Sequence, residues 1–185
     1  MPSVWESLES DCLKIFSLPH NARALADEHL TPADAARRKV KEVQSGLGGS
    51  AVRREIEGPR LFLRVVGGRA YSGEWWFDAD VLHGLDAAYA RIYFSAPDRR
   101  AAIRNMLREL FAISTDFRNN MTEVWALAIP AGERLTAYVG SGAPQWLHQQ
   151  LPPNAPGNRK LVGRAEQYFF PVKNPLWVTS YRSLV

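Results

Sequence analysis

The segment LFLRVVGGRAYSGEWWF, residues 61–77, contains the features that most clearly indicate the fold and the chemistry of this chain. Its first six residues are apolar except for Arg64, and two adjacent valines favour a pleated backbone. A Gly-Gly pair then ends the strand, and a short aromatic segment follows over residues 71–77. The pattern predicts a buried strand followed by a cluster of aromatic side chains.

The arginine and the aromatic cluster together suggest a ligand. An arginine within an apolar strand needs an anion, because burying an unpaired charge is costly. Tyr71, Trp75 and Trp76 offer flat faces for a planar ring. A nucleotide suits this combination, with its phosphates on Arg64 and its ring on the aromatic residues. The alternative is that Arg64 forms a structural ion pair and the aromatic residues belong to the core.

Composition limits the class of protein. The chain has 185 residues, of which 46% are hydrophobic and 23% charged, as in ordinary globular domains. It has no apolar run of about 18 residues that would predict a membrane span, and its polar N-terminus is unlike a secretory signal. A single cysteine, Cys12, excludes internal disulfides, and no Cys and His spacing predicts a zinc site. We therefore expect no metal.

Helical patterns occupy the N-terminal part of the chain. One helix is predicted over residues 3–18, and a second begins after Thr31, whose hydroxyl is a suitable N-cap. The segment SGLGGS, residues 45–50, has the composition of a flexible linker. The chain is therefore predicted to have a helical appendage, residues 1–50, and a working domain, residues 51–185.

The working domain has the pattern of an α+β fold. Strands are predicted over residues 61–66, 91–95, 122–130, 134–140 and 165–171, and one long helix over residues 97–113. The strands over 122–130 and 134–140 are predicted to form a hairpin. The order of elements does not alternate as in doubly wound folds. No glycine-rich dinucleotide motif follows a strand, and no phosphate-binding loop motif is present.

Five short motifs resemble, in their order along the chain, a known class of domain. The sequences FLRVV, SGEWW and IYFS resemble RES-type and other ADP-ribosyltransferase-like domains. The later segments EVWALAIPAGERLTAYVGSGAPQW and GRAEQYFFPVKNPLW resemble the NAD-consuming domains of bacterial polymorphic toxins. The resemblance covers residues 60–178. It implies two small split β-sheets with an NAD-binding cleft between them.

The resemblance also implies an activity and a set of site residues. Such domains cleave the nicotinamide–ribose bond of NAD, either by hydrolysis or by transfer of ADP-ribose to a macromolecular acceptor. Cleavage builds positive charge on the ribose, and an oriented oxygen atom stabilises that charge. The matching positions in this chain predict catalytic roles for Ser95, Glu166 and Gln167, and NAD-binding roles for Arg64, Tyr71, Ser72, Trp75 and Trp76.

Glu166 and Gln167 are alternative candidates for the principal catalytic residue. They are adjacent on a predicted strand, so their side chains point to opposite faces. The motif match favours Gln167, whereas the chemistry of charge stabilisation favours Glu166, and we expect Gln167. Arginine-modifying transferases carry Glu or Gln two residues before the catalytic Glu. Those places hold Arg164 and Ala165 here, which favours hydrolysis or a different acceptor.

The same resemblance implies a biological setting. We expect a bacterial toxin or effector that acts in the cytoplasm of a target cell, is exported without a cleavable signal, and is neutralised by an inhibitor protein. A non-enzymatic reading stays open. The net charge of +4, the pI of 9.4 and two basic helices, 32–45 and 97–112, also suit an adaptor or nucleic-acid-binding module.

Overall fold

A seven-stranded sheet occupies the centre of the computed structural model, which describes residues 2–66, 75–83, 95–115, 121, 123–163 and 165–181. The strand order is β1-β5-β8-β3-β2-β4-β9, and every neighbouring pair is antiparallel. The strands are β1 (Val52–Glu57), β2 (Arg60–Val66), β3 (Trp75–Asp78), β4 (Glu123–Ile129), β5 (Arg134–Ser141), β8 (Glu166–Phe169) and β9 (Val178–Tyr181). A separate ribbon pairs β6 (Gln145–Trp146) with β7 (Lys160–Leu161). The α+β class predicted from the sequence is confirmed.

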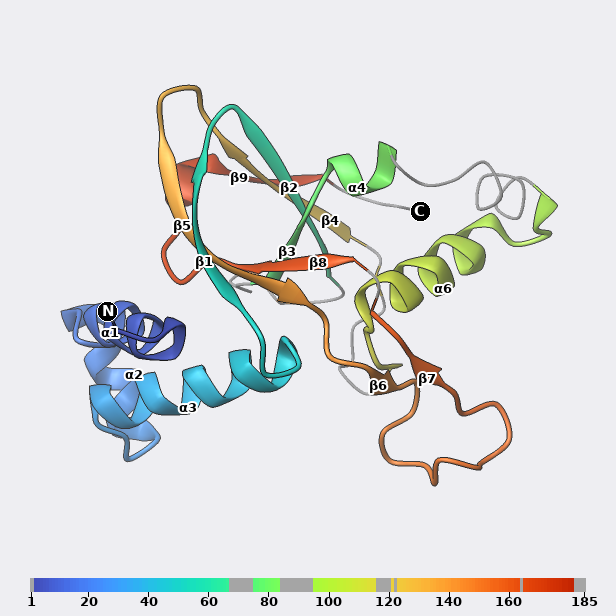
Figure 1. Ribbon diagram of the computed structural model, residues 1–185, viewed down its shortest axis with the longest axis horizontal. Helices are drawn as coiled ribbons and strands as arrows, with labels where there is room; N and C mark the ends of the chain where they lie inside the picture. Colours follow the sequence, from blue (N-terminus) through green and yellow to red (C-terminus); the bar gives the residue numbers. More distant parts are fainter. Residues whose placement is uncertain are drawn as a thin grey trace.

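The helices lie outside this sheet (Figure 1). They are α1 (Val4–Phe16), η1 (Pro19–Asn21), α2 (Ala22–Asp27), α3 (Pro32–Gly46), α4 (Asp80–His83), α6 (Arg99–Phe111) and η3 (Pro175–Trp177). The predicted cap of α3 is confirmed, because Thr31 Oγ1 accepts a hydrogen bond of 3.1 Å from the Asp34 amide. Helix α6 starts two residues later than expected. The Ala101 amide in its first turn donates a hydrogen bond of 3.0 Å to Asp98 Oδ1, so Asp98 caps this helix.

The predicted hairpin between β4 and β5 is also wrong. Strand β4 pairs with β2 and β9, whereas β5 pairs with β1 and β8. The reason lies where the β1–β2 connection meets the β4–β5 connection. Gly58 of the first lies so close to Pro130 of the second that a β-carbon on Gly58 would overlap the proline carbonyl. The Gly58 amide also donates to the Glu133 carbonyl at 2.9 Å. The β1–β2 and β4–β5 connections thus turn a shared corner, which separates the two ladders and curls the sheet.

One face of the sheet lines the inside of this curl, and we call it the inner face. Its core draws residues from strands far apart in the strand order, such as Val139 on β5 and Leu127 on β4. Strand β3 joins the two halves, pairing through its first residues with β8 and through its last residues with β2. The buried core residues of the inner face are Phe62, Trp76, Leu127, Ile129, Ala137, Val139, Tyr168 and Phe170.

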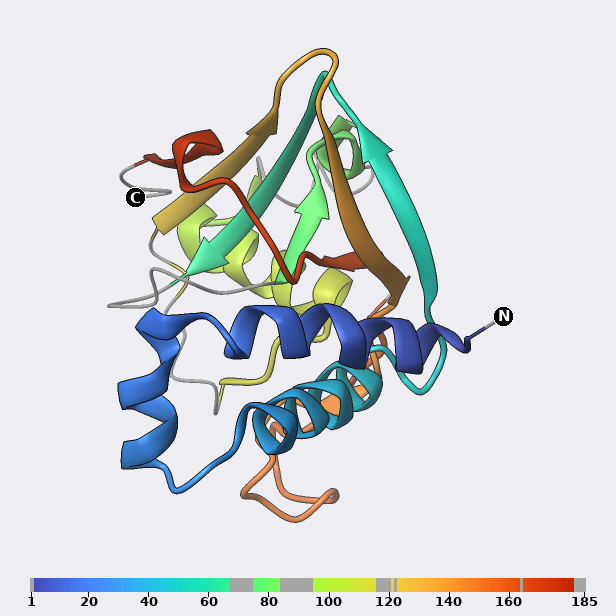
Figure 2. The same ribbon diagram turned by 90° about the vertical axis from the view of Figure 1, so that its left-hand side faces the viewer.

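Helices cover the opposite, outer face of the sheet (Figures 1 and 2). Helices α1 and α3 pack on Tyr138 and Phe169, while α6 packs on Val65 and Phe77. The segment predicted as a linker contributes to this packing, because Leu47 is buried within it. The N-terminal helices therefore share a core with the sheet. Within the described ranges, no helix combines the length and the apolar character that a membrane crossing requires.

Candidate functional site

Three of the residues predicted from the sequence project from the inner face. Arg64, Trp76 and Glu166 lie on β2, β3 and β8, which are neighbouring strands. Side chains alternate between faces along a strand. Arg64 is two residues from Phe62, and Glu166 is two residues from Tyr168, and both neighbours belong to the inner-face core, as does Trp76. The fold thus brings together residues that are about 100 positions apart in the sequence.

Glu166 accepts hydrogen bonds from two different strands. Its carboxylate oxygens lie 3.3 Å from the two terminal nitrogens of Arg54, which comes from the edge strand β1. The Tyr168 hydroxyl donates to Glu166 Oε2 at 3.1 Å. The Glu166 side chain keeps 47% of its surface exposed. Its carboxylate is therefore oriented by neighbouring donors and is still accessible to a ligand.

A second ion pair lies close to the same tyrosine. Asp78 is buried and accepts hydrogen bonds from Arg60 at 2.9 and 2.5 Å and from the Asp80 amide at 3.0 Å. Burial, followed by the negative charges of Glu166 and Asp78, raises the pKa of Tyr168 to about 12. The tyrosine therefore remains protonated at neutral pH and continues to donate its hydrogen bond.

The arginines of this site are paired with carboxylates. Arg54 and Arg60 face three carboxylates, because Asp80 also lies 3.9 Å from Arg60. Both guanidinium groups are therefore paired with carboxylates of the protein. The ring of Tyr168 lies 4.8 Å from that of Phe62, so the residue that bonds Glu166 also packs in the aromatic core of the inner face. We name the set Arg54, Arg60, Asp78, Glu166 and Tyr168 the inner-face cluster.

Arg64 and Trp76 add hydrogen-bond donors to the same face. Arg64 stands opposite Trp125 in the β2–β4 ladder, and its Nη1 atom is buried. Trp76 is 4% exposed, and its indole nitrogen has no hydrogen-bond partner among the described residues. A buried donor without a partner is costly. An acceptor group of a ligand or a water molecule would remove that cost.

Gln167 points to the outer face, so the alternation predicted for this strand is confirmed. Its Nε2 donates to the Phe111 carbonyl at 2.6 Å, at the end of helix α6. The amides of Gly163 and Ala165 donate to the Glu109 and Leu110 carbonyls of the same turn. The last carbonyls of a helix lack intrahelical partners. Every second residue from Gly163 to Gln167 therefore donates a hydrogen bond to the C-terminal turn of α6.

The other predicted residues have different surroundings. Trp75 packs in the outer-face core, where its ring lies 5.5 Å from that of Phe169 and against α3 near Gly46. Ser95 is exposed and helical in backbone conformation. Tyr71 and Ser72 lie outside the described residues, so their predicted roles stay predictions.

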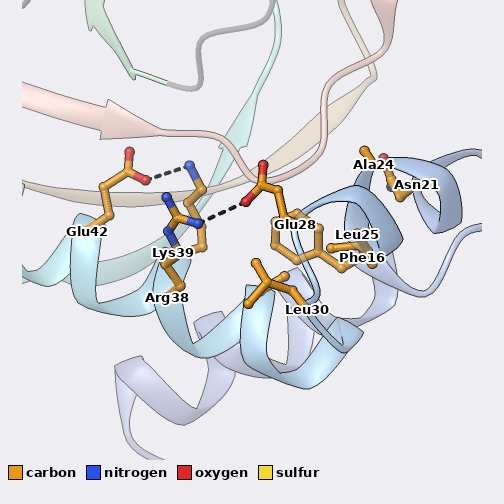
Figure 3. A pocket seen from close by; sticks show the side chains of 10 residues that line it. Phe16, Asn21, Ala24, Leu25, Glu28, Leu30, Arg38, Lys39 and Glu42 are labelled. Carbon is orange, nitrogen blue, oxygen red and sulfur yellow. Dashed lines mark hydrogen bonds and ion pairs between the residues drawn. The ribbon is translucent and has the colours of Figure 1, made fainter.

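A cavity of about 260 Å³ lies between the N-terminal helices (Figure 3). Phe16 forms part of its apolar floor. Its rim carries two ion pairs, Arg38 with Glu28 at 2.9 Å and Lys39 with Glu42 at 2.7 Å. Each cation there is balanced by a carboxylate, Arg38 by one at the end of α2 and Lys39 by one on its own helix α3. Among the residues that the structure describes, no predicted site residue lines this cavity, and we place the candidate site on the inner face.

Sequence reasoning missed four contributors to the inner-face cluster, among them Arg60, which pairs with Asp78. Tyr168 carries a usable signal, because a residue two positions from Glu166 on a strand shares its face. Asp78 also follows Trp76 at that spacing. Arg54 has no such signal, since 112 positions separate it from Glu166 and only the fold joins them. Across the described ranges, no group of three or more His, Cys, Asp or Glu side chains is arranged to hold a metal ion.

Comparison with known proteins returned no match, either among the models of protein families or among curated protein sequences.

Proposed function

We propose that this protein cleaves the nicotinamide–ribose bond of NAD at the inner face of its sheet, with Glu166 as the residue that stabilises the transition state. The observation that carries the proposal is the shared face of Arg64, Trp76 and Glu166 on three neighbouring strands. These residues come from separate motifs of the NAD-consuming resemblance. Their convergence on one surface is what a common site requires.

The chemistry of the cluster supports this reaction. The nicotinamide ring of NAD is a cation, and its departure leaves positive charge on the ribose. A fixed carboxylate stabilises that charge most when it is already oriented before the reaction. Glu166 is held by Arg54 and Tyr168 and is half exposed. In this mechanism it interacts with the ribose at the bond that breaks, and the nicotinamide departs as a neutral molecule. A water molecule, or an acceptor group, then bonds to the same ribose carbon and loses a proton to solvent, which yields ADP-ribose or its conjugate.

Arg64 is assigned to the diphosphate of the substrate. Strands β2 and β8 flank β3, so the backbones that carry Arg64 and Glu166 are about 10 Å apart. One dinucleotide can bridge that spacing, with its ribose at Glu166 and its phosphates at Arg64. Arginine suits this role because its guanidinium binds phosphate oxygens in pairs.

This proposal includes an ADP-ribosyltransferase-like fold, with NAD bound beside the exposed Glu166 of the inner-face cluster. It keeps the setting expected from the resemblance: a bacterial toxin or effector with an inhibitor protein as partner. The residues before Glu166 do not form the pair found in arginine-modifying transferases. We therefore favour hydrolysis of NAD, or transfer to an acceptor other than arginine.

Incubation of the purified protein with NAD tests the proposal. Chromatography would follow nicotinamide and ADP-ribose, and radiolabelled NAD added with a cell lysate would report transfer to macromolecules. Stoichiometric release of nicotinamide and ADP-ribose indicates hydrolysis, and label on a lysate component indicates transfer. If neither nicotinamide nor labelled product forms, the proposed function is wrong.

A further inference from the structure

We propose that Arg54 is a positioning residue, which holds the Glu166 carboxylate in its reactive orientation. Arg54 does so from the edge strand β1, which lies two strands away from β8 in the same sheet. This inference rests on the proposed NAD-cleaving function. It adds a residue that none of the sequence motifs contains. Arg54 lies in β1, outside the segment covered by the resemblance.

The register places Arg54 on the inner face. Arg54 pairs with Ala137 in the β1–β5 ladder, and Ala137 belongs to the inner-face core. The neighbouring Arg53 points to the other face, where it lies 3.9 Å from Asp11 of helix α1. Strand β5 lies between β1 and β8. The Arg54 side chain therefore crosses a whole strand to reach Glu166.

The contact between the two side chains is made by two pairs of atoms. Arg54 Nη1 lies 3.3 Å from Glu166 Oε2, and Nη2 lies 3.3 Å from Oε1. A planar guanidinium that contacts both carboxylate oxygens fixes the plane of the carboxylate as well as its position. The Tyr168 hydroxyl bonds Oε2 from another direction. Together the three donors restrict the rotation of the Glu166 side chain.

Fold stability is a weak explanation for this ion pair. Arg54 and Glu166 retain 45% and 47% exposure, and pairs this exposed contribute about 0–1 kcal/mol. The same ladder has a comparable pair that serves no site, Arg134 with Glu57 at 2.7 Å, with both side chains about two thirds exposed. Arg134 therefore provides a matched control for the loss of a cross-strand arginine.

Steady-state nicotinamide release by the full chain tests this inference, using Arg54→Ala, Arg54→Lys and Arg134→Ala beside the wild type. A positioning role predicts that Arg54→Ala lowers kcat by about 10- to 100-fold, because small misplacements of a reacting group cost rate on this scale. KM should change by less than about threefold, since ground-state binding is retained. Arg54→Lys should recover part of the loss, because lysine supplies a charge without the paired contact. Arg134→Ala should match the wild type.

Other outcomes overturn the inference in distinguishable ways. A raised KM with unchanged kcat means that Arg54 binds the substrate. Unchanged kcat and KM in Arg54→Ala, combined with loss of activity in Glu166→Gln, removes the role of Arg54 and leaves the proposed function intact. An inactive wild-type protein removes the proposed function and this inference together. Thermal unfolding of each variant checks that the rates refer to folded protein.

Discussion

The side chain of Gln167 donates a hydrogen bond of 2.6 Å to the backbone carbonyl of Phe111, the residue that ends helix α6. The space around this contact is tight, because a β-carbon on Gly142 would overlap the Gln167 amide. The side-chain amide of Gln167, the residue favoured by the motif match, is thus hydrogen-bonded to the C-terminal end of α6. This contact, together with the inner-face position of Glu166, is why the geometry favours Glu166 as the reactive residue.

Replacing Gln167 by Ala should therefore lower stability more than it lowers turnover. The change leaves the Phe111 carbonyl without its side-chain donor, and losing such a bond at a partly buried site costs about 1–3 kcal/mol. Urea unfolding would measure the loss. Gln149→Ala is the matched control, because its amide donates to Gln145 at an exposed position and its loss should cost little. Equal stabilities for the two variants would contradict the helix-end role.

Tyr168→Phe should change how stability depends on pH at alkaline values. The folded protein holds the pKa of Tyr168 at about 12, above the usual value near 10. A raised pKa means that folding favours the protonated phenol. Its contribution is fully present below pH 10 and is lost as the pH rises towards 12. The free energy of unfolding of the wild type should therefore fall relative to that of Tyr168→Phe over this window, by an amount on the order of 2 kcal/mol.

Chemical unfolding at several pH values between 8 and about 12 would follow this difference, within the range over which the usual and raised pKa values lie. The other tyrosines titrate in both proteins, so the comparison isolates Tyr168. A constant difference between the two proteins across the window would show that the hydroxyl of Tyr168 titrates normally.

Leu8→Ala should destabilise the whole chain in a single transition. Leu8 on α1 is fully buried in a core that also contains Tyr138 and Phe169 of the sheet. Truncating a buried leucine costs about 2–5 kcal/mol. Leu13 on the same helix is 39% exposed, so Leu13→Ala should cost much less and serves as the control. Two separate unfolding transitions, with only the first affected, would show that residues 1–50 fold independently.

Local signals in the sequence predict the elements of this fold better than their pairing. Thr31 predicts the start of α3 because a hydroxyl before a helical pattern satisfies free amides within the same turn. The β-branched run around Arg64 predicts β2 for a similarly local reason. The prediction of a β4–β5 hairpin is wrong because the sequence of the connecting turn does not differ from that of an ordinary hairpin turn. Only the approach of Gly58 to Pro130, across more than 70 residues, makes it a corner.

For the candidate site too, the sequence predicts single residues better than it predicts their arrangement. Arg64 and Glu166 can be selected from the sequence because each stands out chemically within an apolar strand. Their common face depends on β3 joining the two halves of the sheet, which no local pattern encodes. The choice between Glu166 and Gln167 depends on the register, and a shift by one residue exchanges the two faces. The long-range contact with Arg54 depends on the curl of the whole sheet.

The most direct test compares the rate of nicotinamide release from NAD by the wild type, Glu166→Gln and Gln167→Ala. The glutamine variant keeps the size of the side chain and removes its charge, so any stabilisation of the ribose cation by the carboxylate is lost. Removing one preorganised stabilising group of this kind costs about 100-fold or more in kcat. We therefore predict a loss of that size in Glu166→Gln and a loss below about tenfold in Gln167→Ala. Full activity of Glu166→Gln, or a larger loss in Gln167→Ala than in Glu166→Gln, would contradict the assignment of the reaction to the inner face.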